Sequence, residues 1–190
     1  MKYLALGDSY TIGTGASDDA HAWPSIIAAR LGAELTNPAV NGYTTEDLIR
    51  AELPLVQLVD PDLVTVLIGV NDLVQGRTID QYRHSLAMIY NAIEDRPVVA
   101  VSIPTWSYVP ASAQFGGAPQ VERLTTEFND VARGQATARG FAWVDLGPAS
   151  TSGIGTDGWI ASDDLHPGDA QYAAWAEAIW PVVRQRLTTV

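Results

Sequence analysis

The most strand-like stretch of the sequence is Leu63-Val64-Thr65-Val66-Leu67-Ile68, in which five of six residues are apolar. Apolar residues at successive positions, rather than at alternate ones, predict a strand that is buried on both faces, as in a parallel sheet. Gly69-Val70-Asn71-Asp72 follows this stretch directly. Ligands bind beyond the carboxyl ends of the strands in open α/β sheets. The residues that follow each strand are therefore the first candidates for a functional site.

Shorter apolar segments and longer amphipathic segments alternate along the rest of the chain. Further strands are expected at Tyr3–Leu6, Leu35–Val40, Pro97–Ile103 and Phe141–Val144. Helices are expected at Trp23–Leu31, Glu46–Val59, Ile79–Glu94, Gln120–Arg139 and Gly168–Leu187. This alternation predicts an α/β protein, a three-layer α/β/α sandwich around a five-stranded, mostly parallel sheet with right-handed crossovers.

Length, charge and composition narrow the possible functions. The 190 residues predict one domain spanning residues 1–190. With 22 acidic and 11 basic residues, the net charge is −11. Such a field repels phosphate backbones and anionic lipids, so we expect no nucleic-acid partner and no stable membrane association. Cysteine is absent, which excludes disulfides and thiolate zinc sites. No signal peptide follows Met1, which predicts a cytoplasmic protein, or a secreted one if a leader has been removed.

The residues after the predicted strands form a set with a common chemistry. Ser9 follows the first strand, Gly42 the second and Asn71 the third, while Asp163 and His166 lie between the last strand and the last helix. Histidine can take a proton from a serine hydroxyl near neutral pH, and a carboxylate can orient the imidazole. Amide donors can stabilise the oxyanion of an acyl transfer. The set thus predicts a serine hydrolase, with neutral imidazole required for activity.

These motifs resemble those of the GDSL-type esterases and lipases, also called SGNH hydrolases. The resemblance implies a flavodoxin-like SGNH-hydrolase fold, with Ser9 as nucleophile, Asp163 and His166 as acid and base, and an oxyanion hole of Ser9, Gly42 and Asn71. It also implies a small-molecule ester or thioester substrate and no cofactor. Tyr10 departs from the leucine that is most usual there, and Gln171 from a frequent glycine.

Several alternatives stay open at the level of sequence. Asp164 competes with Asp163 for the acid role, and Asp145 at the end of the last strand is a more distant candidate. Asp8 and Asp72 are expected to bond backbone groups rather than to take part in catalysis. His166 has no second histidine at ligand spacing, so no metal site is expected. A catalytically silent ligand-binding module on the same fold is the main alternative to an enzyme.

Two long segments, Pro104–Pro119 and Gly147–Asp163, carry aromatic residues on Gly-containing loops. They are expected either to fold onto the core or to wall an acyl pocket and act as lids. Trp106, Tyr108 and Phe115 are the candidate substrate-binding residues. Small neutral esters with short acyl chains are favoured, acetylated carbohydrates among them, because the acidic surface disfavours anionic substrates. A lysophospholipase or an acyl-thioesterase is the alternative within the family, and the sequence does not indicate an oligomeric state.

Overall fold

A computed structural model describes residues 1–188. Its sheet has five parallel strands in the order β2-β1-β3-β4-β5, so the expectation of a parallel sheet is confirmed. The strands are β1 (Lys2–Gly7), β2 (Glu34–Thr36), β3 (Leu63–Leu67), β4 (Val98–Val101) and β5 (Ala142–Val144). All five residues of β3 are buried, which explains why its sequence is apolar at successive positions.

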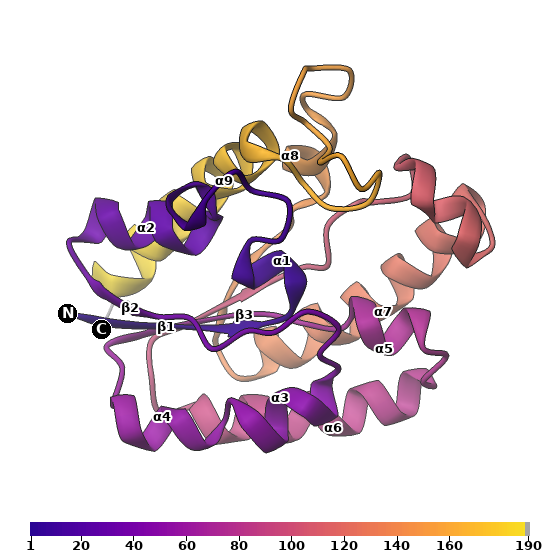
Figure 1. The fold of residues 1–190 in the computed structure, drawn as a ribbon. Helices are drawn as coiled ribbons and strands as arrows, with labels where there is room; N and C mark the ends of the chain where they lie inside the picture. The colour runs from indigo at the N-terminus through magenta and orange to yellow at the C-terminus, as the bar shows by residue number, and fades with distance from the viewer. Residues whose placement is uncertain (189–190) are drawn as a thin grey trace.

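Helices cover both faces of this sheet and complete the three layers (Figure 1). One face carries α2 (Trp23–Leu31) and α9 (Asp169–Thr188), and the other carries α3 (Thr45–Ala51), α4 (Pro54–Val59), α6 (Ile79–Ile93) and α7 (Ala118–Ala138). The strand order reverses direction between β1 and β3, so the crevice expected in such sheets lies beyond the carboxyl ends of these two strands.

Two predicted elements differ from those observed. The expected helix Glu46–Val59 is two helices, α3 and α4, because Pro54 has no N–H to continue the first helix. The expected strand Leu35–Val40 is shorter and ends at Thr36, ahead of Pro38, which cannot donate to a strand ladder. The break between α3 and α4 leaves Glu52 at the end of α3 with its side chain in the protein interior.

Short helices that are too brief for a periodic pattern begin directly after the strands. These are α1 (Ser9–Ile12), α5 (Val70–Val74) and α8 (Gly147–Thr151), and two 3-10 turns, η1 (Asp19–His21) and η2 (Pro110–Phe115), accompany them. The first two follow β1 and β3 and carry two of the candidate site residues, Ser9 and Asn71. No helix within residues 1–188 is both long and apolar enough to cross a membrane.

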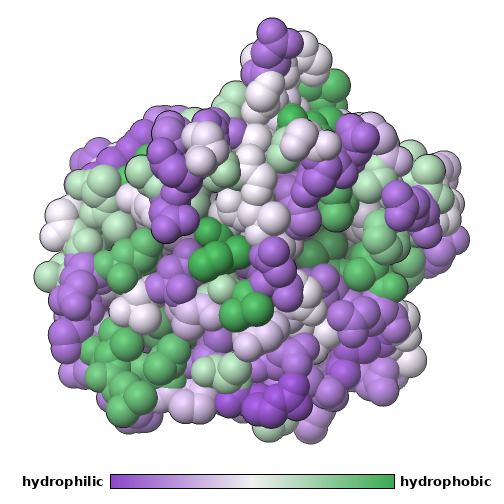
Figure 2. All heavy atoms as spheres, in the orientation of Figure 1, coloured by the Kyte–Doolittle hydropathy of each residue, from purple (hydrophilic) through white to green (hydrophobic). Residues whose placement is uncertain are grey.

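The face of the molecule that is turned to the viewer in Figure 1 mixes hydrophobic and hydrophilic side chains on its surface. Figure 2 shows its broadest hydrophobic area over α4, where Leu58 is 77% exposed. The core lies on both sides of the sheet, and its largest fully buried side chains include Trp23 from α2 and Trp175 from α9. Both indoles are buried between the sheet and the helices α2 and α9.

Candidate active site

The turn after β1 presents Ser9 at the start of α1. Asp8 caps this helix by accepting a 3.0 Å hydrogen bond from the N–H of Tyr10 through Oδ1. Gly7 cannot be replaced here, because an added Cβ would lie 2.2 Å from Thr11 Oγ1 and 2.4 Å from the carbonyl oxygen of Leu67. Within residues 1–188, no group accepts a hydrogen bond from the N–H of Ser9. This amide is therefore available to a ligand atom at the crevice.

The segment before α9 joins His166 to Asp163. The Nδ1 atom of His166 lies 2.6 Å from Oδ2 of Asp163, and Oδ1 of Asp163 accepts the N–H groups of Leu165 at 3.0 Å and His166 at 2.9 Å. Partial burial alone would raise the pKa of Asp163, but these hydrogen bonds outweigh it and hold the pKa below its ordinary value. The arrangement fixes an ionised carboxylate against the imidazole. The ion pair of the ring is with Asp163, and Asp164 is exposed and adopts a positive φ of 61°.

Asn71 lies on α5, directly after β3. Its Nδ2 donates one hydrogen to the carbonyl of Tyr43 at 2.9 Å, which leaves the second hydrogen of the amide for a ligand. Gly69 precedes α5 with a φ of 131°, and an added Cβ there would lie 2.7 Å from the ring of Tyr82. Only glycine meets both conditions, which accounts for the first residue of the Gly69–Asp72 segment.

Asp72 ties the turn that carries Gly42 to the helix that carries Asn71. The carboxylate of Asp72 accepts hydrogen bonds from the N–H of Thr45 at 2.8 Å and from the hydroxyl of Thr45 at 2.6 Å. Arg77 Nε forms an ion pair with the same carboxylate at 3.0 Å. The N–H of Gly42 has no acceptor within residues 1–188. As expected, Asp72 and Asp8 both bond backbone N–H groups.

One crevice brings most of these side chains together. Ser9, Asn71 and His166 line a cavity of about 90 Å³, and its remaining walls are largely apolar: Tyr10, Val70, Val74, Trp106, Phe115 and Leu165. The ring of Tyr10 meets that of His166 edge-on, with centroids 6.0 Å apart. Within the described chain, no hydrogen bond joins the Ser9 hydroxyl to His166, although both residues line this cavity. Gly42 lies on the adjoining turn and does not line this cavity.

The aromatic residues of the first long loop divide between two environments. Trp106 and Phe115 pack edge-to-face at 5.5 Å and line the crevice. Tyr108 does not line it, because its hydroxyl donates to the carbonyl of Ser150 at 2.7 Å and bonds Trp159 and Gln171. Gln171 is itself buried and donates to the same carbonyl at 2.9 Å. Gln171 thus links the segment around Ser150 to α9. This is the residue that departs from the glycine that is frequent in the GDSL-type esterases.

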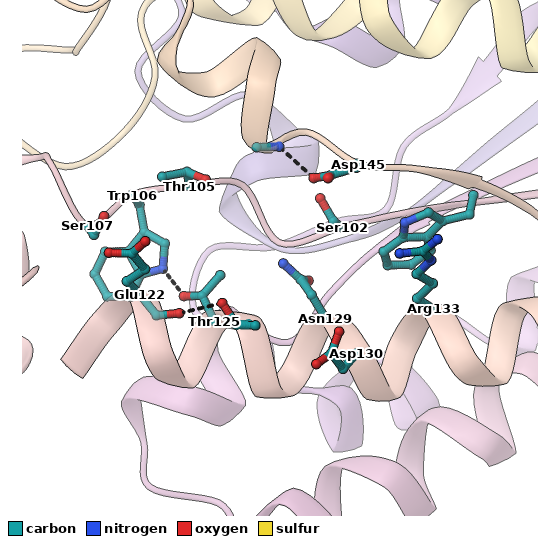
Figure 3. A pocket seen from close by; sticks show the side chains of 13 residues that line it. Ser102, Thr105, Trp106, Ser107, Glu122, Thr125, Asn129, Asp130, Arg133 and Asp145 are labelled. Atoms are coloured by element: carbon teal, nitrogen blue, oxygen red, sulfur yellow. Dashed lines mark hydrogen bonds between the residues drawn. The ribbon is translucent and has the colours of Figure 1, made fainter. Parts of the chain in front are cut away.

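A second cavity of about 260 Å³ lies on the other side of Trp106, between α7 and the carboxyl ends of β4 and β5 (Figure 3). Asp145, the more distant candidate acid, faces this cavity and accepts the N–H of Gly147 at 2.8 Å. The structure thus places Asp145 away from the cavity that His166 lines. Trp106 separates the two cavities and donates through Nε1 to Thr125 at 3.0 Å.

Three apolar crevice residues were missed in the sequence. Val70 and Val74 flank Asn71 and stand four residues apart, so both fall on one face of α5. Leu165 lies between Asp163 and His166. The sequence signal for these three residues is that each lies within three positions of a candidate site residue, Asn71 or His166. No group of three or more potential metal-ligating His, Cys, Asp or Glu side chains occurs in residues 1–188.

Residues 5–174 match the GDSL-like Lipase/Acylhydrolase family, and the chain belongs to it. Membership places the chain among carboxylic ester hydrolases. It is 26% identical to Esterase TesA of Pseudomonas aeruginosa over 191 residues, a match that covers 97% of this chain and 88% of that protein. Lipase 2 of Streptomyces coelicolor is 39% identical over 88 residues, 38% of this chain, and the matched part is 30% of the length of that lipase. The crystal structure of a lipase/acylhydrolase from Enterococcus faecalis superposes with a TM-score of 0.78 at 25% identity, covering 100% of this chain and 97% of the other.

Proposed function

We propose that this protein hydrolyses small carboxylic esters through a Ser9–His166–Asp163 triad. The observation that carries the proposal is the 2.6 Å contact between His166 Nδ1 and Asp163 Oδ2, with His166 lining the same crevice as Ser9 and Asn71. The carboxylate keeps the proton on Nδ1, so Nε2 is free to act as a base. This is the tautomer that a serine nucleophile requires.

The reaction proceeds in two similar halves. His166 removes the proton of Ser9 as the hydroxyl attacks the ester carbonyl, and the oxyanion forms against the N–H groups of Ser9 and Gly42 and the amide of Asn71. His166 then protonates the leaving alkoxide. Water, activated by His166, hydrolyses the acyl-enzyme and restores Ser9. The free N–H groups of Ser9 and Gly42 and the unused amide hydrogen of Asn71 support this assignment of donors.

The dimensions and charge of the crevice favour a short, neutral substrate. Its volume of about 90 Å³ is well below the ~300–1,000 Å³ that is typical of sites for drug-sized ligands. Its apolar walls, Val70, Val74, Trp106 and Phe115, fit an acyl group rather than a polar one. The net charge of −11 disfavours anionic substrates. Esters of short acyl chains are therefore the expected substrates.

Hydrolysis of a chain-length series of p-nitrophenyl esters tests the proposal. Ser9→Ala should lower kcat by ~10⁶-fold, because the nucleophile is lost. Ser17→Ala is the matched control, since Ser17 Oγ also lies beside a histidine, 3.2 Å from His21 Nδ1, but is exposed. The control should keep full activity. Retention of turnover by Ser9→Ala would contradict the assignment, and a silent binding module would show no turnover in any of the three proteins.

A further inference from the structure

The dipeptide Asn41-Gly42 forms an exposed turn between β2 and α3. The N–H of Tyr43 donates to the carbonyl of Val40 at 3.2 Å, and Gly42 adopts a φ of 83°, which favours glycine. Asn41 and Gly42 are both exposed, and a Cβ added at Gly42 would meet no atom within 4 Å beyond its chain neighbours. Solvent therefore reaches both the side chain of Asn41 and the backbone that follows it.

A nucleophilic nitrogen and an electrophilic carbon lie in these two adjacent residues. The backbone N–H of Gly42 has no acceptor within residues 1–188, so no hydrogen bond restrains its nitrogen. Oδ1 of Asn41 accepts a hydrogen bond from the hydroxyl of Thr14, whereas Nδ2 of Asn41 donates to no group in the described chain. The bond from Thr14 stabilises negative charge on Oδ1 and so makes Cγ of Asn41 a better electrophile. The unbonded Nδ2 is free to depart.

None of the other four asparagines of the chain combines these features. Asn37 precedes Pro38, whose nitrogen carries no hydrogen. Asn71, Asn91 and Asn129 lie within the helices α5, α6 and α7, and each precedes a residue with a side chain. That side chain obstructs the approach to the following nitrogen, which glycine leaves open. The turn before α3 is therefore the one place where an asparagine amide and an unobstructed backbone nitrogen meet.

We propose that Asn41-Gly42 is a self-modifying site, at which Asn41 loses ammonia and becomes isoaspartate. The nitrogen of Gly42 attacks Cγ of Asn41 and closes a five-membered imide, while the Cγ–Nδ2 bond breaks and Nδ2 leaves as ammonia with the proton of the Gly42 N–H. Water then adds to one imide carbonyl, and the bond from that carbon to nitrogen breaks as the nitrogen regains a proton. Breaking the former peptide bond gives isoaspartate, and breaking the new bond gives aspartate. One water enters and one ammonia leaves, so no other reactant is needed.

The chain is anchored on both sides of this turn. After the turn, the carbonyl of Tyr43 accepts a hydrogen bond from Nδ2 of Asn71 at 2.9 Å. Before the turn, Nδ2 of Asn37 donates to the carbonyl of Thr11 at 2.9 Å. Isoaspartate adds one methylene carbon to the main chain between these two anchors. The turn itself must take up the extra length, and the N–H of Gly42 is displaced with it.

The modification limits the working life of the enzyme. This consequence rests on the proposed esterase function, in which the N–H of Gly42 is an oxyanion donor. Removing one such donor costs ~10²–10³-fold in kcat. The carboxylate of isoaspartate also adds a negative charge to the same turn, which disfavours an oxyanion. Both effects act on the transition state, so kcat falls while KM changes little.

Site-resolved mass spectrometry of the full chain tests the modification without any turnover. The protein is kept for days in warm, mildly alkaline buffer, and samples are digested in mild acid, which halts the reaction. The peptide that carries Asn41 should gain about 1 Da, with fragment ions of isoaspartate. Asn41→Gln is the matched control, because it keeps the amide but can close only a less favourable six-membered ring, and it should stay unmodified. A native peptide of unchanged mass, or one that yields aspartate alone, would overturn the proposal.

Hydrolysis of p-nitrophenyl acetate by the same samples tests the consequence. The kcat of the native protein should fall in parallel with the isoaspartate fraction, by ~10²–10³-fold at full conversion, while Asn41→Gln keeps its starting activity. Freshly prepared Asn41→Asp, which carries the charge without the extra methylene carbon, should lose much less.

Two outcomes separate this proposal from the esterase assignment. Isoaspartate formation at constant kcat, or an equal loss in Asn41→Asp, would overturn the displacement of Gly42. A native protein that is inactive from the start would contradict the esterase function, and the mass of the Asn41 peptide would still decide whether the site modifies itself.

Discussion

Asp163→Asn replaces a single atom and tests the orientation of the imidazole. The carbonyl of the new amide can keep both backbone bonds of Oδ1, from Leu165 at 3.0 Å and His166 at 2.9 Å. Those two bonds place the NH₂ group where Oδ2 lies, 2.6 Å from His166 Nδ1. The NH₂ group must then donate to Nδ1, so the ring proton moves to Nε2. His166 is held in place but in the tautomer that cannot accept the proton of Ser9.

The size of the effect follows from this geometry. The corresponding change in a serine protease triad, in which position is kept and the tautomer is reversed, lowers kcat by ~10⁴-fold. At ~1.4 kcal/mol per factor of ten, this is about 5.5 kcal/mol of transition-state stabilisation. The Tm should change little, because the backbone bonds survive and the side chain of Asp163 is 44% exposed.

The assay is steady-state hydrolysis of p-nitrophenyl acetate, with kcat and KM measured separately. Asp164→Asn is the matched control, because the ring pairs with Asp163 instead, Asp164 is exposed, and asparagine tolerates the φ of 61° found there. Asp163→Asn should lose kcat at nearly constant KM, and Asp164→Asn should lose neither. The reverse result, with activity lost in Asp164→Asn and kept in Asp163→Asn, would refute the assignment of the acid.

Three further outcomes are expected. Asn71→Ala should lower kcat by ~10²–10³-fold with little change in KM, since the amide stabilises the oxyanion rather than the substrate; a change in KM alone would exclude that role. Tyr108→Phe should lower the free energy of unfolding by about 1–2 kcal/mol in urea titrations, because the hydroxyl of Tyr108 donates to the carbonyl of Ser150. It should leave KM for acetate esters unchanged, because Tyr108 does not line the crevice. A raised KM would instead indicate that Tyr108 contacts the substrate. Thermal stability should peak in mildly acidic solution, as calorimetry over a pH series can show. The raised pKa values of Asp8 and Glu52 remove stability as pH rises from about 4 towards 8, and the lowered pKa of Asp163 removes it as pH falls below about 4. A stability maximum at alkaline pH would contradict these directions.

The strands, and the candidate residues that the structure brings together, could be predicted from the sequence because both are local signals. The apolar run of β3 and the Asn71 that follows it lie within ten residues of one another. The same holds for Asp163 and His166, three residues apart in one turn. Parallel topology then brings the strand ends to one edge, which places Ser9 and Asn71 at the same crevice.

Features that depend on contacts between distant segments could not be read in this way. Tyr108 looks like a pocket residue in the sequence, but its hydroxyl meets Ser150 and Gln171, 42 and 63 residues away. Glu52 appears as an ordinary polar position within one amphipathic helix. The helix break at Pro54 leaves Glu52 at the end of α3, and Glu52 accepts a hydrogen bond from the N–H of Gly7, 45 residues earlier. These two features place Glu52 next to the turn that carries Ser9, and neither can be seen in the local sequence.

Covalent labelling can identify the nucleophile, which is expected to be Ser9, independently of turnover. The protein is treated with a fluorophosphonate, and the modified residue is located by peptide mass spectrometry. A single adduct is expected on Ser9. It should be absent in Ser9→Ala and form much more slowly in His166→Ala, because the imidazole activates the hydroxyl. No adduct on the native protein, or an adduct on another serine such as Ser17, would contradict it.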